Sequence, residues 1–120
     1  MKHCLVIEDS RVIRTVARRI FEELNFATGE AEDAMAALRA CREQMPDVIF
    51  VDWNLPGMSG LEFVKSLRGQ VGGDRPVILL CTTENDVDEI THAVAAGAND
   101  YVMKPFDRSI LSAKLAEIGV

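Results

Sequence analysis

The sequence has few cysteines and no long apolar run. Its three cysteines, Cys4, Cys41 and Cys81, are widely spaced, and no pair shows the CxxC spacing of a metal finger or redox motif. We therefore expect buried, reduced thiols. No stretch approaches the roughly 18 apolar residues that span a membrane, and the amino-terminal apolar run is too short for a signal peptide. These absences predict a soluble, cytoplasmic protein without membrane insertion.

Basic charge is also scarce. The chain has 13 Lys and Arg against 19 Asp and Glu, which gives a formal net charge of -6. Nucleic-acid-binding domains need a basic face, so this balance argues against a nucleic-acid partner. The length of 120 residues and the hydrophobic fraction of 48% suit one domain with its own core. We expect residues 1–120 to form a single domain.

Apolar runs and amphipathic segments alternate five times along the chain. Continuous apolar runs at residues 4–7, 48–51 and 77–81 predict strands that are buried on both faces. Weaker runs at 26–30 and 101–103 predict edge strands. Apolar residues at helical spacing predict a helix after each strand. Candidate helix caps are Ser10 (or Asp9), Asn85 or Asp86, and Asp107.

Strict alternation of strand and helix predicts an α/β fold, with a five-stranded parallel sheet and helices on both faces. The three strongly apolar strands should be central and the two weak ones should be edges. The order 2-1-3-4-5, which is the established order of flavodoxin-like folds, satisfies this condition. Such sheets bind ligands at the carboxyl ends of their strands, at the switch point between the first and third strands.

Polar residues that could take part in catalysis or metal binding follow four of the predicted strands. Glu8 and Asp9 follow the first strand, Asp52 the third, Thr82 the fourth and Lys104 the fifth. Neighbouring strands lie about 4.8 Å apart, so these side chains are expected to meet at one edge of the sheet. Crowded carboxylates need a cation or a raised pKa. With no histidine or cysteine among them, the all-oxygen set favours Mg²⁺.

This arrangement favours phosphoryl transfer. Asp52 is the most central acid and therefore the expected nucleophile, since aspartyl phosphate is an established covalent species. The ammonium of Lys104 and the hydroxyl of Thr82 would contact the phosphoryl oxygens. Each residue alone also has a structural explanation as a cap, a surface charge or a core side chain. Their shared position at the carboxyl ends of strands is what favours the functional interpretation.

At these residues the chain resembles the receiver domains of bacterial two-component response regulators, especially the CheY-like single-domain kind. The resemblance spans the whole chain and is carried by Glu8-Asp9, the segment 52–60, Thr82, Tyr101 and Lys104-Pro105. It implies that Asp52 is the phosphoacceptor. It implies that Mg²⁺ is bound by Glu8 (mainly through water), Asp9, Asp52 and the backbone carbonyl of Asn54.

The resemblance also implies a switch and its tuning. Thr82 would turn toward the phosphate, Tyr101 would move inward, and the bond before Pro105 would be cis. Asn54 and Glu84, each two residues beyond a site residue, would tune dephosphorylation. The expected protein is a monomeric phosphorylation switch that is not an enzyme in the usual sense. It would accept phosphate from a histidine kinase or histidine phosphotransfer protein, and would contact a downstream protein through its fourth helix, fifth strand and fifth helix.

Other functions remain open from the sequence. One is a phosphorelay shuttle to a histidine phosphotransfer protein, and another is a receiver used only as a scaffold. A small-molecule phosphatase or a flavin-binding protein is a more remote alternative. No Ser/Thr/Gly-rich phosphate loop follows the first strand, which argues against flavin. Asn54 stands where a phosphatase of this kind would need its general acid.

Overall fold

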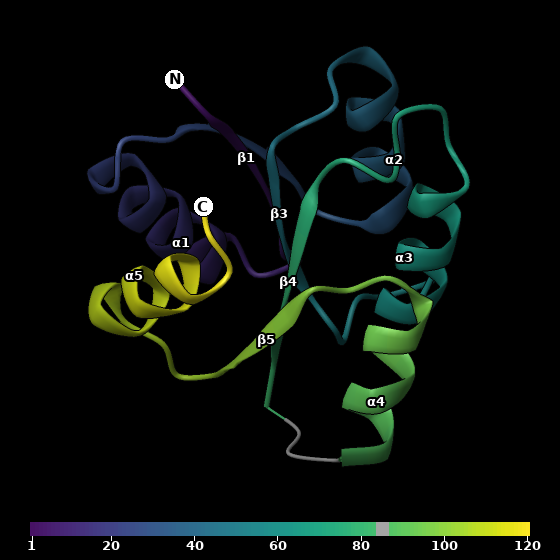
Figure 1. Ribbon diagram of the computed structural model, residues 1–120. Coiled ribbons are helices and arrows are strands. Elements are labelled where there is room, and N and C mark those ends of the chain that lie inside the picture. Colours follow the sequence, from purple (N-terminus) through teal and green to yellow (C-terminus); the bar gives the residue numbers. More distant parts are fainter. Residues whose placement is uncertain (84–86) are drawn as a thin grey trace.

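The computed structural model describes residues 1–83 and 87–120. It contains one parallel sheet in the order β2-β1-β3-β4-β5, as predicted. The strands are β1 (His3–Ile7), β2 (Ala27–Ala31), β3 (Val48–Asp52), β4 (Val77–Thr82) and β5 (Asp100–Met103). The helices are α1 (Arg11–Glu23), α2 (Ala34–Glu43), α3 (Gly60–Arg68), α4 (Val87–Ala96) and α5 (Arg108–Glu117). Helices α1 and α5 cover one face of the sheet, and α2, α3 and α4 cover the other (Figure 1).

Side-chain caps explain where several helices begin. The predicted caps Ser10 and Asp107 accept hydrogen bonds from the amides of Ile13 and Ile110 at the starts of α1 and α5. Such caps satisfy amides that have no partner within the helix. The cap predicted at Asn85 or Asp86 lies outside the described residues. At the other end of α1, Asn25 has a positive φ of 70°, a conformation that Asn tolerates better than most residues.

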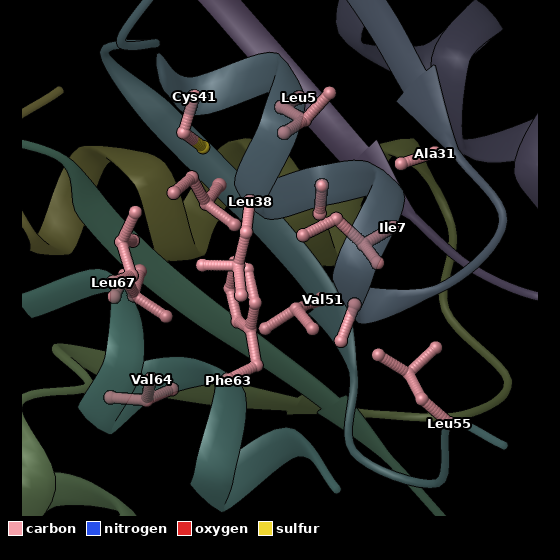
Figure 2. Close-up of a cluster of buried hydrophobic side chains, with 14 of the residues drawn as sticks. Leu5, Ile7, Ala31, Leu38, Cys41, Val51, Leu55, Phe63, Val64 and Leu67 are labelled. Atoms are coloured by element: carbon pink, nitrogen blue, oxygen red, sulfur yellow. The ribbon is translucent and has the colours of Figure 1, made fainter. Parts of the chain in front are cut away.

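The core lies on both faces of β3, whose five residues are all buried. Ile49 and Val51 pack toward α2 and α3, in the cluster of Figure 2, whereas Val48 and Phe50 pack toward α1 and α5. This alternation follows from the two-residue period of a strand. Because side chains pack against β3 on both faces, the backbone position of its last residue, Asp52, is fixed.

The structure corrects some details of the sequence-based picture. Strand β2 begins at Ala27 rather than at residue 26, and the Phe26 side chain enters the core next to Phe21. Helix α3 buries Phe63 together with Val64 and Leu67. The apolar residues Val87 and Val94 of α4 are 72% and 48% exposed. Helical spacing alone therefore overstated how much of α4 packs on the sheet.

The predicted burial of the cysteines is confirmed. Cys4, Cys41 and Cys81 are all buried and free. Burial raises the pKa of Cys4, and raises those of Cys41 and Cys81 to about 11 and about 12. In the described part of the chain, no helix combines the length and apolar character needed to cross a membrane.

Candidate functional site

The carboxyl ends of β1 and β3 bring three acids together. Glu8 and Asp9 follow β1 and Asp52 ends β3, and one carboxylate oxygen from each lies within 4.8 Å of the others. The side chains of Glu8 and Asp52 are almost fully buried, with residue exposures of 4% and 5%, whereas Asp9 faces solvent. The predicted cluster is therefore present, and it is open to ligands on the side of Asp9.

Lys104 reaches the two buried acids from the end of β5. Its Nζ lies 3.5 Å from Oδ2 of Asp52 and 3.4 Å from Oε1 of Glu8. Its backbone amide donates a hydrogen bond of 2.9 Å to the carbonyl of Thr82, and its peptide bond to Pro105 is cis, as predicted. Since the side chain is only 17% exposed, Lys104 is not an ordinary surface lysine.

The charges of the site do not balance. Burial, together with the nearby carboxylate of Asp52, raises the pKa of Glu8 to about 7, and Lys104 offsets only part of this rise. Burial alone would lower the pKa of Lys104, but Asp52 and Glu8 hold it above its usual value. With all three acids ionised, three negative charges face one ammonium, so two negative charges are uncompensated.

A divalent cation would supply that missing charge. The donors are all oxygens and one of the acids faces solvent, which suits Mg²⁺ because this ion prefers oxygen ligands and keeps several waters. The backbone amide of Asn54 donates a hydrogen bond of 3.2 Å to Oδ1 of Asp52 and so orients that carboxylate. The side chain of Asn54 is exposed. The donor set therefore fits the predicted metal, which the carboxylates of Glu8, Asp9 and Asp52 could hold.

Of the other predicted residues, the structure describes Thr82 and Tyr101. Thr82 ends β4 directly after Cys81, the residue paired with Asp52 across the sheet, and is 3% exposed. Tyr101 lies half-buried on β5, where the ammonium of Lys114 sits 5.5 Å from the centre of its ring. Lys114 also pairs with Asp100 at 3.4 Å. Glu84 lies outside the described residues.

Trp53 and Gly60 form a tight contact beside Asp52 that the sequence did not indicate. A Cβ added to Gly60 would lie 2.5 Å from Cε3 of Trp53, so only glycine fits at the start of α3 without a shift. Trp53 also borders a small hollow of about 10 Å³ that reaches Thr82 and Ile90. The single tryptophan of the chain therefore adjoins the candidate phosphoacceptor and can report on its surroundings.

Comparison with known proteins identifies the family. Residues 4–116 match the response regulator receiver domain. The chain belongs to this family. It is 36% identical over 118 residues to the phosphate regulon transcriptional regulatory protein PhoB of Escherichia coli K12, which covers 98% of the chain. The match covers 51% of PhoB, so the chain spans about half the length of this curated relative.

Solved structures show the same fold. Chemotaxis protein CheY4 of Vibrio cholerae superposes with a TM-score of 0.93 at 31% identity, and 98% of each chain is covered. The receiver domain of sensor histidine kinase PA1611 from Pseudomonas aeruginosa PAO1 has a TM-score of 0.88 at 30% identity, with 99% and 98% covered. That structure has a magnesium ion coordinated in its active-site cleft. The chain is thus a CheY-like receiver domain of the response regulator family.

Proposed function

We propose that this receiver domain is a phosphorylation switch in which Asp52 accepts a phosphoryl group from a phosphohistidine. One observation carries the proposal. The carboxylate of Asp52 is held at the end of the central strand β3 by the ammonium of Lys104 at 3.5 Å and the amide of Asn54 at 3.2 Å. A nucleophile so fixed meets the main demand of phosphoryl transfer, which is positioning.

In the transfer, a carboxylate oxygen of Asp52 attacks phosphorus while the P–N bond of the donor breaks. The donor imidazole leaves with the electron pair of that bond. Lys104 would stabilise the charge on the phosphoryl oxygens, and the hydroxyl of Thr82 would donate a hydrogen bond to one of them. Glu8, Asp9, Asp52 and the carbonyl of Asn54 would hold Mg²⁺, which when bound supplies charge neutralisation.

The new phosphoryl group would change how the site is paired. The phosphoryl group carries about 1.5 to 2 negative charges but replaces the single charge of the Asp52 carboxylate, so the site gains about one. The phosphoryl oxygens would compete with Glu8 for Lys104. We expect Lys104 and Thr82 to turn toward the phosphate and Tyr101 to move inward, away from Lys114. Since Tyr101 lies on β5, this would repack the face made by α4, β5 and α5, to which a downstream protein would bind.

The donor is expected to approach over α1. A groove of about 340 Å³ runs beside the site, and it is lined mainly by apolar residues of α1 and of the segment after β5: Val12, Ile13, Val16, Thr83, Lys104, Pro105 and Phe106. Val12 is 73% exposed and Val16 is 45% exposed. A phosphohistidine must come within bonding distance of Asp52, so we expect the donor protein to cover the exposed apolar residues of α1 beside the groove, here called the α1 rim. Exposed apolar side chains favour such contact.

A phosphotransfer assay tests the proposal. The chain is incubated with a phosphorylated histidine phosphotransfer protein, with Mg²⁺ or with EDTA, and the phosphorylated fraction is read by mass spectrometry. The wild type should gain one phosphoryl group only with Mg²⁺, and Asp52→Asn should gain none. Asp74→Asn, at an exposed loop position, is the matched control and should be labelled like the wild type. Full labelling of Asp52→Asn would refute the proposal.

The same assay separates a terminal switch from a relay shuttle. Phosphate that returns from Asp52 to an unphosphorylated histidine phosphotransfer protein would favour the shuttle, whereas loss to water alone would favour the switch. Val12→Lys should slow transfer from the protein donor by about tenfold relative to transfer from acetyl phosphate, because only the protein donor needs the α1 rim. Equal slowing of both reactions would contradict docking over α1.

A further inference from the structure

We propose that Arg14 is a positioning residue for the metal ligands Glu8 and Asp9. Its guanidinium donates a hydrogen bond of 2.8 Å to the backbone carbonyl of Glu8, from one turn inside α1. The proposal is that this bond fixes the turn that carries both acids and so sets the affinity for Mg²⁺. It rests on the proposed function, because it takes Mg²⁺ to bind at these acids.

The carbonyl of Glu8 needs a partner from outside the sheet. Strand β1 pairs with β3 only as far as Ile7 and Val51, so Glu8 lies just past the last pair of that ladder. On the other side, the amide of Glu8 donates to the carbonyl of Ala31 at 3.1 Å. Because Glu8 is buried, its carbonyl would lose hydrogen bonding to water without a substitute. Arg14 provides that substitute, and both backbone groups of Glu8 are thereby fixed.

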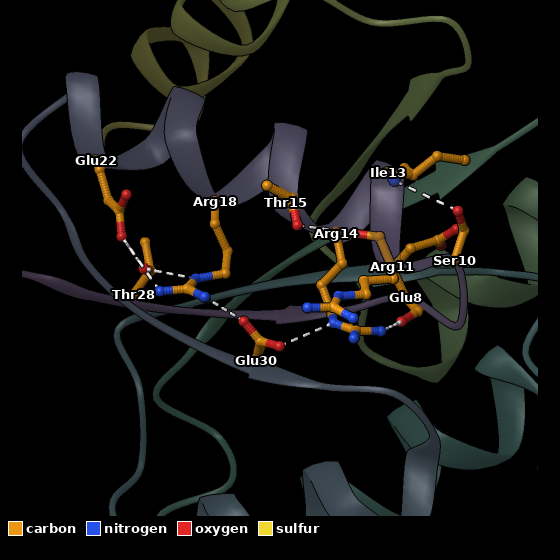
Figure 3. A network of polar contacts seen from close by, with 10 residues as sticks. All are labelled: Glu8, Ser10, Arg11, Ile13, Arg14, Thr15, Arg18, Glu22, Thr28 and Glu30. Atoms are coloured by element: carbon orange, nitrogen blue, oxygen red, sulfur yellow. Dashed lines mark hydrogen bonds and ion pairs between the residues drawn. The ribbon is translucent and has the colours of Figure 1, made fainter.

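Arg14 is itself anchored to the edge strand β2. Its Nε pairs with Oε1 of Glu30 at 3.1 Å, and its side chain is only 12% exposed. Glu30 also pairs with Arg18, whose Nε donates to Oγ1 of Thr28 at 3.2 Å. Figure 3 shows these contacts as one chain from α1 across β2 to the turn of Glu8. The guanidinium of Arg14 thus contacts Glu30 and the Glu8 carbonyl through two separate nitrogen atoms. A lysine has one nitrogen at the end of its side chain and cannot reproduce this geometry.

Charge and positioning predict opposite effects of removing Arg14. A positive side chain beside the site repels Mg²⁺, so loss of its charge alone would tighten metal binding. Loss of a hydrogen bond that orients the ligands would weaken metal binding, typically by 10-fold to 100-fold. The direction of the change therefore identifies the role.

Arg18 provides a matched control for Arg14. It carries the same charge on the same helix and pairs with the same acid, Glu30. Its hydrogen bonds in the described part of the chain go to Glu22, Thr28 and Glu30, and none of them goes to Glu8. Substitution of Arg18 therefore repeats the change in charge and in the Glu30 network while leaving the bond to Glu8 in place.

The experiment is a Mg²⁺ titration of the full chain by calorimetry, with Trp53 fluorescence as a second readout. We expect Arg14→Met and the charge-preserving Arg14→Lys to weaken Mg²⁺ binding by about 10-fold. Arg18→Met and Arg18→Lys should stay within about twofold of the wild type. If Arg14→Met fails to fold, Arg14→Lys keeps the charge and carries the test.

Two kinds of result would overturn the proposal. One is Mg²⁺ binding by the Arg14 variants that equals or exceeds that of the wild type. The other is equal weakening by the Arg14 and Arg18 variants, since that would assign the effect to the Glu30 network as a whole. A wild type that does not bind Mg²⁺ would instead refute the metal site of the proposed function, and this inference with it. Failure of the two proposals can thus be told apart.

Discussion

The raised pKa of Glu8 predicts that Glu8→Gln stabilises the metal-free protein at pH 8 but hardly at pH 5. Gln has the shape of a protonated Glu and cannot ionise, so the comparison isolates the ionisation of one carboxyl group. In the folded chain the pKa of Glu8 rises from 4.5 to about 7. Between these values the unfolded chain binds fewer protons than the folded one. The free energy of unfolding therefore falls as the pH rises.

The size of the effect follows from the same two pKa values. Linkage gives a loss of about 2.5 kcal/mol between pH 5 and pH 8 from the ionisation of Glu8 in the wild type. We expect Glu8→Gln to avoid this loss, so its advantage over the wild type should grow by about 2 kcal/mol over that range. Mg²⁺ should stabilise the wild type more at pH 8 than at pH 5, because a carboxyl ligand must lose its proton to bind metal.

Urea unfolding in EDTA at pH 5, 6.5 and 8, followed by Trp53 fluorescence and circular dichroism, measures these free energies. Glu32→Gln, at an exposed position, controls for the loss of one negative charge. Parallel pH curves for the wild type and Glu8→Gln would refute the reasoning. A Glu8→Gln variant that is less stable than the wild type at pH 8 would do so as well.

Three further substitutions test contacts within the site and elsewhere in the fold. Lys104→Met should lower the free energy of unfolding at pH 8 by about 3 kcal/mol, because two buried carboxylates lose their cation, and Mg²⁺ should restore part of it in urea unfolding. Gly60→Ala should destabilise by about 1 to 3 kcal/mol and shift the emission of Trp53, whereas Gly69→Ala, whose added methyl has no atom nearer than 3.6 Å, should do neither. Arg68→Met should lower the melting temperature without changing Mg²⁺ affinity, because Arg68 donates to the carbonyls of Gly73, Pro76 and Gly97. An unchanged melting temperature would contradict this role.

The sequence predicted which side chains meet at this edge of the sheet, because those residues occupy the ends of strands. An apolar run that stops at an acid or a lysine marks both the strand and its carboxyl end, as at Asp52 and Lys104. Parallel strands place all such ends at one edge of the sheet, so the assembly of the site followed from topology. Lys104 spans β4 to reach Asp52 because its long side chain covers the distance of two strands.

The supporting residues could not be predicted in the same way. Arg14 of α1 and Arg68 of α3 both donate hydrogen bonds to backbone carbonyls. Every residue has a backbone carbonyl, so the sequence does not indicate which carbonyl an arginine will contact. The carbonyl of Gly97, which Arg68 contacts, is 29 residues away. Likewise, in the segment between α3 and β4, the carbonyls of Gly73 and Pro76 accept hydrogen bonds from Arg68.

In the proposed switch, the unbalanced negative charge of the site would let a phosphoryl group on Asp52 act on the distant face made by α4, β5 and α5. Lys104 is the cation that faces Glu8 and Asp52 among the described residues, and it is shared between them at nearly equal distances. A phosphoryl group on Asp52 would therefore draw Lys104 away from Glu8, with which it is already paired.

A shift of Lys104 would also act on β5. The backbone amide of Lys104 donates to the carbonyl of Thr82, and Lys104 directly follows β5, so its movement would displace the strand that carries Tyr101. Since Lys114 contacts both Asp100 and the ring of Tyr101, the same strand is also held from the outer surface. The switch is thus expected to depend on two lysines: Lys104, which follows β5, and Lys114, which contacts Asp100 and Tyr101 within it.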